Sequence, residues 1–254
     1  MSSRTWTPGA LASEARRLSG RCWRAVEAQH KVSTLKLVDT LAEQAILESL
    51  IETSKPPIPP ECRGLHYLLA TPFRYGAPYP QGSRFRRAGM TAGVFYASER
   101  VETAITELAF HRLLFFAESP ETPWPLNAGE FTSFAANYST AHGLDLNLPP
   151  LDADSATWRH QTDYAPCQSL AEAARYAAFE VIRYASARDR NGVNIALLTC
   201  RAFRSPRPAG LQTWRIQFGA SGVRAICEFP QRRLELTRAA FHGDPRIARL
   251  RWNR

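Results

Sequence analysis

The chain has 254 residues, enough for one large domain or for a domain with an appendage. Apolar residues make up 44% of it, which allows an ordinary hydrophobic core, and no apolar run approaches the roughly 20 residues of a membrane-spanning helix. The formal net charge is +9, and from residue 201 onward there are twelve Arg against three Asp or Glu, so the excess lies in the last fifth of the chain. Such a basic surface suits nucleic acid, an acidic protein partner or an anionic substrate.

Cysteine usage and the N-terminal segment indicate the compartment. The five cysteines are an odd number, are widely scattered and form no C-x-x-C pair, which argues against a disulfide framework and against a zinc site. The first residues carry no apolar stretch after their basic residues, as a secretory signal would. We therefore expect a cytoplasmic protein with reduced thiols and no metal.

The first sixty residues are expected to form a helical extension. Residues 9–53 read as helical, and Thr40-Leu41-Ala42-Glu43 is a capping box at the start of an apolar helical stripe. The proline-rich stretch SKPPIPP at 54–60 cannot continue a helix and is expected to be a linker. The expected organisation is an N-terminal helical extension with its linker over 1–60, a main domain over 61–238 and a basic, peripheral tail over 239–254.

The main domain is expected to be α+β. GLHYLLA (64–70) and AGVFYA (92–97) read as strands, and Ser98 is a candidate N-cap for a helix that ends near Phe116. Residues 117–165 contain prolines and polar turns and give no clear element. Ser169-Leu170-Ala171-Glu172 is a second capping box that would open a helix to about Phe179. The remaining segments, EVIRYAS, VNIALLTC, TWRIQF, VRAICEF and RLELT, read as short strands.

Several common catalytic motifs are absent from the sequence. It contains no G-x-x-x-x-G-K-[ST], no G-x-G-x-x-G after a strand, no H-E-x-x-H and no G-x-S-x-G, and its six His are dispersed. At the level of motifs this excludes P-loop kinases, Rossmann-type dehydrogenases, zinc peptidases of that class and serine hydrolases with a nucleophile elbow.

The candidate site comes from polar residues at the ends of the expected elements. Two arginines could bind a pyrophosphate, a tyrosine ring could stack on a cationic heterocycle, and a carboxylate beside a ribose could stabilise positive charge at the anomeric carbon. A serine hydroxyl could orient that carboxylate or the ribose. Together these groups point to NAD+, although each residue alone has an ordinary explanation as a solvated loop, core or surface residue. The candidates are Arg74, Tyr75, Arg84, Tyr96, Glu107 and Ser186.

In this order, the sequence resembles the RES domain family, named for its Arg, Glu and Ser. The matching segments are FRYG, GSRF, GVFYASERVETAITELAFHR and QSLAEAARYAAFEVIRYASARDRNGVNIALL, and the resemblance covers roughly residues 61–230. It places the family's three residues on Arg74, Glu107 and Ser186 as catalytic residues. Its neighbouring NAD+-binding positions fall on Tyr75, Arg84 and Tyr96. One departure is Arg86, which stands where the family has Asn in a Gly-Gly-Arg-Phe-Asn run.

The resemblance also implies a fold, a reaction and a partner. The implied fold is an ADP-ribosyltransferase-like split mixed β-sheet with surrounding helices. The implied activity is that of a toxin of a bacterial toxin–antitoxin pair, which depletes NAD+ by phosphorolysis or hydrolysis. NAD+ is then the substrate, inorganic phosphate a candidate co-substrate, and no metal takes part. Arg86 and Arg87 would either be peripheral or draw in that phosphate. A helix-turn-helix antitoxin would cover the cleft, and the N-terminal helices offer a surface for a homodimer or for this partner.

Two other functions stay open at this point. Some members of the family are described as transferring ADP-ribose to a protein, and this would use the same residues. A nucleic-acid-binding module would instead use the basic C-terminal region, with an affinity that falls steeply with salt. No helix-turn-helix or RNP-like motif supports this last function, and we expect no membrane binding.

Overall fold

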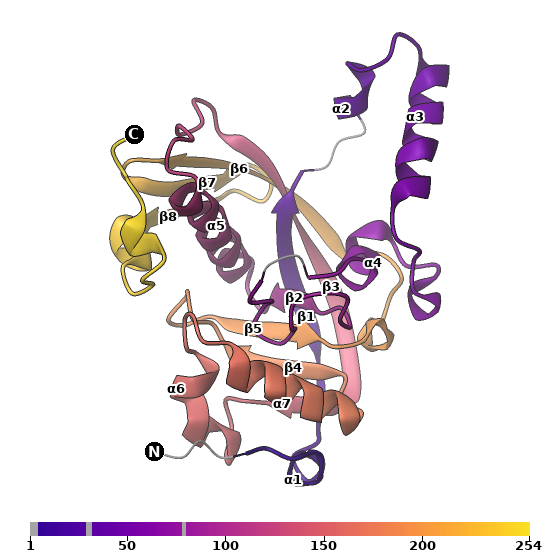
Figure 1. Ribbon diagram of the computed structural model, residues 1–254, viewed down its shortest axis with the longest axis vertical. Helices are drawn as coiled ribbons and strands as arrows, with labels where there is room; N and C mark the ends of the chain where they lie inside the picture. The colour runs from indigo at the N-terminus through magenta and orange to yellow at the C-terminus, as the bar shows by residue number, and fades with distance from the viewer. Residues whose placement is uncertain (1–4, 29–31, 78–79) are drawn as a thin grey trace.

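The computed structural model describes residues 5–28, 32–77 and 80–254. Residues 29–31 of the expected N-terminal helix and residues 78–79 of the Arg-rich segment lie outside this part. Eight strands form one sheet in the described residues (Figure 1). They are β1 Arg16–Glu27, β2 Phe95–Ser98, β3 Gly129–Asp145, β4 Val181–Ala185, β5 Val193–Leu197, β6 Gly210–Gly219, β7 Gly222–Cys227 and β8 Arg232–Thr237. The α-helices are α1 Pro8–Ala12, α2 Val32–Leu35, α3 Leu41–Ser54, α4 Tyr67–Arg74, α5 Val101–Glu118, α6 Ser155–Trp158 and α7 Ala165–Tyr176.

The sheet is mixed and closes on itself at one end. Its strand order is β1-β2-β5-β4-β3-β6-β7-β8, and β1 also pairs with β3 along its whole length. Strands β1 to β5 therefore form a closed ring, from which β6, β7 and β8 extend as an antiparallel meander. The pairing of β3 with β4 is parallel, whereas the other pairings between named strands are antiparallel. The expected α+β class with a mixed sheet is confirmed.

Two helices pack on different parts of this sheet. Helix α5 lies beside β7, and α7 runs along β4 and β5 (Figure 1). Ile105, Phe110 and Leu113 of α5 share a buried cluster with Trp214 and Ile216 of β6. Residues of α7 form a second cluster with β4 and β5, to which Leu11 of α1 belongs. These two buried clusters hold α5 and the ends of β4 and β5 in place, and a polar face lies between them.

The first strand corrects the expectation of a helix over residues 9–53. Residues 16–27 form β1, which pairs residue by residue with β3, as in Cys22 opposite Ala136 and Glu27 opposite Phe131. The segment RRLSGRCWRAVE has no continuous apolar helical stripe, and pairing along its length outweighs its local helical tendency. The capping box at Thr40 and Glu43 is confirmed at the start of α3. The division of the chain at residue 60 stays a prediction.

The segment GLHYLLA is helical rather than a strand. Helix α4 begins at Tyr67, after His66, whose Nδ1 accepts a hydrogen bond from the backbone N–H of Leu68. A short apolar run does not distinguish a buried strand from a helix, and Leu69 and Ala70 are buried as one helical face. Arg74 is consequently the last residue of a helix rather than the residue after a strand.

Both expected caps in the main domain are wrong in position. Helix α5 begins at Val101 without a side-chain cap, and the Ser98 hydroxyl donates instead to Asn194. Helix α7 already begins at Ala165, so Ser169 lies inside it. The longest described strand of the sheet, β3, lies in the region 117–165, for which no element was expected. Polar residues interrupt the alternation of this strand, and it pairs with β1 on one edge and with β6 on the other.

The basic C-terminal segment is not peripheral. Phe241, Ile247 and Leu250 are buried in the same cluster as α5 and β6. Their apolar side chains are separated by basic residues, and it is this charge that made the segment look like a solvated tail. In the described part of the chain, no helix is long and apolar enough to cross a membrane.

Candidate active site

A row of side chains on one face of the sheet leads to the candidate site. Ser98 of β2 lies opposite Asn194 of β5, which lies opposite Tyr184 of β4. Side chains of directly opposed residues project from the same face of a sheet. Ser186 follows two residues after Tyr184, and its backbone N–H donates to the carbonyl of Gly192 at 2.8 Å. The four residues therefore share one face at the end of three neighbouring strands.

Glu107 of α5 contacts these residues through one of its two carboxylate oxygens. Its Oε1 accepts a hydrogen bond of 2.6 Å from the Ser186 hydroxyl and another of 2.6 Å from the Asn194 amide. The described residues provide no hydrogen-bond partner for Oε2 of this half-buried carboxylate. The carboxylate is thus fixed through one oxygen, and the other is available to a ligand.

Ser186 is held so that its proton points to Glu107. The residue is fully buried, and its Oγ accepts hydrogen bonds from the backbone N–H groups of Arg188, at 3.0 Å, and Asp189, at 2.9 Å. With its acceptor capacity used by these two donors, the hydroxyl proton is directed to the carboxylate. Asn194 is fixed in the same way, because its Oδ1 accepts the Ser98 hydroxyl at 2.7 Å.

Tyr96 lies on the same face of β2 as Ser98, two residues before it. Its hydroxyl accepts a hydrogen bond of 2.9 Å from the backbone N–H of Phe85 and lies 2.9 Å from the Ser83 hydroxyl. Burial raises the pKa of this phenol to about 12. On the neighbouring strand β1, Arg24 donates to the backbone carbonyl of Tyr96 at 2.8 Å, and burial lowers the pKa of its guanidinium to about 10.

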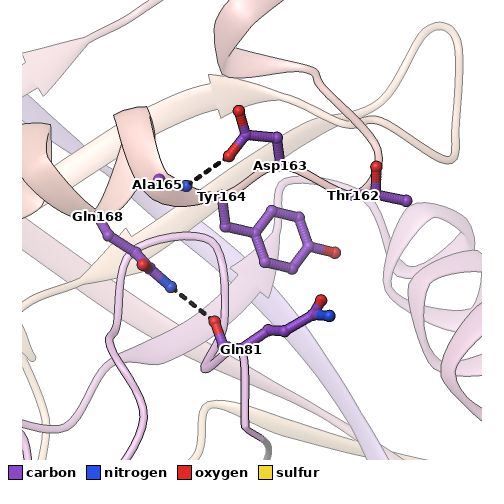
Figure 2. Close-up of a pocket in the computed structure, with 6 residues that line it drawn as sticks. All are labelled: Gln81, Thr162, Asp163, Tyr164, Ala165 and Gln168. Atoms are coloured by element: carbon purple, nitrogen blue, oxygen red, sulfur yellow. Dashed lines mark hydrogen bonds between the residues drawn. The ribbon is translucent and has the colours of Figure 1, made fainter.

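Arg84 links this face to a cavity. Its guanidinium is buried, donates to the carbonyl of Trp158 at 2.5 Å, and lies 5.0 Å from the centre of the Tyr164 ring. Tyr164 lines a cavity of about 430 Å³, and Figure 2 shows its ring in the middle of the lining side chains. The other lining residues are Gln81, Thr162, Asp163, Ala165 and Gln168.

Arg74 and Tyr75 are not brought to Glu107 by any described contact. The Arg74 guanidinium pairs with Glu52 of α3 at 2.6 Å and also donates to the carbonyl of Pro56 in the linker. Tyr75 is partly exposed, with its ring 5.9 Å from Arg74. The structure therefore unites Glu107 and Ser186, and it places Arg74 against the N-terminal segment instead.

Arg86 and Arg87 make protein contacts of their own. Arg86 donates to the carbonyls of Tyr75, at 2.7 Å, and Thr91, at 2.5 Å. Arg87 pairs with Glu172 of α7, which lowers the pKa of that carboxyl through the hydrogen bond. Both guanidinium groups therefore already have protein partners, which a phosphate would have to replace.

The sequence reasoning missed Asn194 and gave Ser98 another role. Asn194 is buried in the middle of an apolar strand, and a lone amide at such a position needs a hydrogen-bond partner. That signal was present in the segment VNIALL. The approach of Arg24 from β1 and of Tyr164 from α7's N-cap gave no such signal, because both depend on the tertiary fold.

Comparisons with known proteins show the family of the chain. The sequence model of the RES domain matches residues 58–219. The fold is also similar to the crystal structure described as the M. tuberculosis MbcT-MbcA toxin-antitoxin complex, with a TM-score of 0.45 and 12% identity over 92% of this chain and 95% of that one. A search of curated proteins finds no significant relative. Because the RES match spans well over half of the sequence and includes Arg74, Glu107 and Ser186, the chain belongs to the RES domain family.

Proposed function

We propose that this protein cleaves the bond between nicotinamide and ribose in NAD+. The observation that carries the proposal is the Glu107 carboxylate, bonded at Oε1 by Ser186 and Asn194 and without a described partner at Oε2. A carboxylate fixed in this way before the substrate arrives needs little reorganisation to stabilise positive charge.

The chemistry requires charge stabilisation rather than a strong acid. When the bond breaks, nicotinamide leaves as a neutral molecule with the bonding electron pair, and positive charge develops at the anomeric carbon and the ring oxygen, as in glycoside hydrolysis. Glu107 would accept hydrogen bonds from the ribose hydroxyls and face the developing charge. Water or phosphate then adds to the anomeric carbon, and in the case of water the extra proton passes to solvent.

Ser186 and Asn194 act in this proposal as positioning residues. Each donates to the carboxylate oxygen that is turned away from the substrate, so the free oxygen keeps one orientation. Tyr96 is neutral at physiological pH, since burial raises its pKa to about 12, and it would offer an uncharged ring to the substrate. Arg84 would contribute positive charge on the side of the Tyr164 cavity.

Arg74 requires a rearrangement to act on NAD+. Its guanidinium is occupied by Glu52 and the Pro56 carbonyl, so a substrate phosphate would have to replace a surface carboxylate. Glu52 is exposed, and the exchange of one exposed anion for another costs little. The contact with α3 is therefore compatible with a phosphate-binding role for Arg74.

Membership of the RES family supports a biological role as the toxin of a toxin–antitoxin pair. An antitoxin would act by covering the site around Glu107. The α2–α3 hairpin stands away from the sheet in Figure 1, and the exposed Ile46 and Leu50 of α3 give it an apolar surface suited to a protein partner.

Proton NMR of NAD+ incubated with the purified protein tests the proposed reaction. We expect the nicotinamide signals of NAD+ to be replaced by those of free nicotinamide. Release that requires phosphate would identify phosphorolysis, and release without phosphate would identify hydrolysis. Adenine-labelled NAD+ that labels a protein would identify ADP-ribosyl transfer instead. Intact NAD+ with phosphate and with cell lysate, from protein freed of any co-purified antitoxin, would contradict the proposal.

A further inference from the structure

Arg188 is a buried cation whose hydrogen bonds are incomplete. Its side chain is only 5% exposed, and its Nη2 donates to the carbonyl of Gln161 at 3.0 Å and lies 3.1 Å from Oδ2 of Asp244. The guanidinium carbon lies 3.9 Å from the centre of the Phe110 ring. Its Nη1 is buried and has no hydrogen-bond partner among the described residues. A buried guanidinium nitrogen left in this state is costly unless a ligand completes it.

Asp244 does not fully balance the charge of Arg188, because its carboxylate also pairs with Arg246. Arg246 donates from Nε to Oδ1 of Asp244 at 3.0 Å and from Nη2 to Oδ2 at 2.8 Å, which is a bidentate pair. Burial alone would raise the pKa of Asp244, but the hydrogen bonds from Arg246 and the charge of Arg188 lower it below its ordinary value. Asp244 is therefore ionised and shared by two arginines.

Arginine side chains gather around Tyr164. Arg246 donates to the Tyr164 hydroxyl at 3.3 Å, and its guanidinium carbon lies 5.8 Å from the centre of that ring, which Arg84 approaches to 5.0 Å. Three arginines thus gather here, and two of them share the carboxylate of Asp244. Glu107 also interacts electrostatically with Arg188, and Asp163 lines the cavity. The arginines lie beside the cavity that Tyr164 lines and next to the Glu107 site, since Arg188 also bonds Ser186 through its backbone N–H.

We propose that Arg188 and Arg246, together with Arg84 across the Tyr164 ring, form a binding site for a phosphate oxyanion. A planar guanidinium matches the oxygens of a phosphate, and a phosphate oxygen would supply the acceptor that Nη1 of Arg188 lacks. The anion is either the pyrophosphate of the dinucleotide or inorganic phosphate that attacks the ribose. Which of these applies rests on the proposed function, whereas the site itself does not.

This inference gives the C-terminal segment a role in binding. Arg246 belongs to the segment 239–254, whose Phe241 and Ile247 are buried against α5. That packing fixes Arg246 and Asp244 beside Arg188. The end of the chain thus contributes one cation of the proposed site, Arg246, beside the unpartnered Nη1 of Arg188.

Isothermal titration calorimetry with two probes, inorganic phosphate and ADP, tests the site without any turnover. The variant Arg188→Gln removes one cation, and Arg233→Gln is the matched control, because Arg233 is exposed on β8. We expect the Kd of at least one probe to rise about tenfold or more in Arg188→Gln, a loss of about 1.4 kcal/mol, and to stay unchanged in Arg233→Gln. Arg246→Lys keeps the charge and should weaken binding less than Arg246→Gln.

The two probes distinguish the sources of the anion. Loss of phosphate binding with ADP binding retained would assign the site to the attacking phosphate, and loss of ADP binding would assign it to the pyrophosphate. If Arg188→Gln does not fold, Arg188→Lys replaces it, and raised thermal stability of the wild type in phosphate over chloride at equal ionic strength is the second measurement. A wild type that binds neither probe, or a folded Arg188→Gln that binds both normally, would overturn the inference.

A failure of this anion site can be distinguished from a failure of the proposed function. A protein that binds phosphate through Arg188 but releases no nicotinamide would contradict the proposed reaction and support this site. Nicotinamide release that is indifferent to Arg188→Gln, with unchanged binding of both probes, would contradict this site and support the reaction.

Discussion

Replacement of Asn194 by alanine tests whether Glu107 is a pre-oriented carboxylate. The amide donates to Oε1 of Glu107 at 2.6 Å and is itself fixed by the Ser98 hydroxyl at 2.7 Å. Asn194→Ala removes one of the two described hydrogen bonds to this oxygen, so the carboxylate is held only by Ser186. Asn194 contacts the oxygen that is turned away from the proposed substrate, and it therefore acts by positioning.

The expected size of the effect follows from the strength of a hydrogen bond to a charged group. Such a bond contributes about 1.5–3 kcal/mol, which corresponds to a fall in kcat of about tenfold to about a hundredfold. The KM for NAD+ should change much less, since Asn194 is not expected to touch the substrate. The free energy of unfolding should fall by about 1–3 kcal/mol, because the variant leaves the buried Ser98 hydroxyl without its partner.

Nicotinamide release followed over a range of NAD+ concentrations separates kcat from KM, and thermal melting monitors folding. Asn191→Ala is the matched control, because Asn191 is exposed in the turn three residues earlier. A folded Asn194→Ala protein that retains the kcat of the wild type, or whose loss appears only in KM, would contradict a positioning role for Asn194.

Three further outcomes follow from other contacts. Glu52→Gln removes the carboxylate that pairs with Arg74, so the KM for NAD+ should fall severalfold in steady-state kinetics, and an unchanged KM would count against a phosphate-binding role for Arg74. Phe241→Ala should lower the free energy of unfolding in denaturant by about 3–5 kcal/mol, whereas the exposed Phe229→Ala should leave it nearly unchanged; equal effects would contradict burial of the C-terminal segment. Burial raises the pKa of Tyr96 from 10.0 to about 12, so the folded chain holds this proton more tightly than the unfolded chain. Its contribution to stability is present below pH 10 and is lost as the pH rises toward about 12. Tyr96→Phe should therefore show a smaller alkaline loss of stability in melting experiments, and an identical loss would refute this.

The sequence predicted the proximity of Glu107 and Ser186 better than it predicted the elements that carry them. Glu107 and Ser186 were identified from their positions and from a family resemblance, and the structure places them in direct contact. Short apolar strands such as β4 and β5 were also correct, because their ends are marked by polar turns. The α+β fold class could be predicted for the same reason, because polar turns mark the ends of these strands.

The failures share a physical cause, which is that long-range pairing outweighs local preference. Residues 16–27 look compatible with a helix but pair along β3, and GLHYLLA looks like a strand but packs as a helix. The C-terminal arginines suggested a solvated tail, although Phe241 and Ile247 among them are buried. Neither the contact of Arg74 with Glu52 nor the gathering of arginines around Tyr164 leaves a pattern within a short window of sequence.

The most direct test of the account compares Glu107→Gln with Glu118→Gln in nicotinamide release from NAD+. Both substitutions remove one carboxylate from α5, but Glu118 is exposed near the end of the helix. We expect Glu107→Gln to lose at least about a hundredfold in kcat, as for the loss of a pre-organised charge in a transition state, while Glu118→Gln retains wild-type activity. A folded Glu107→Gln protein that releases nicotinamide at the rate of the wild type would contradict the assignment of this site.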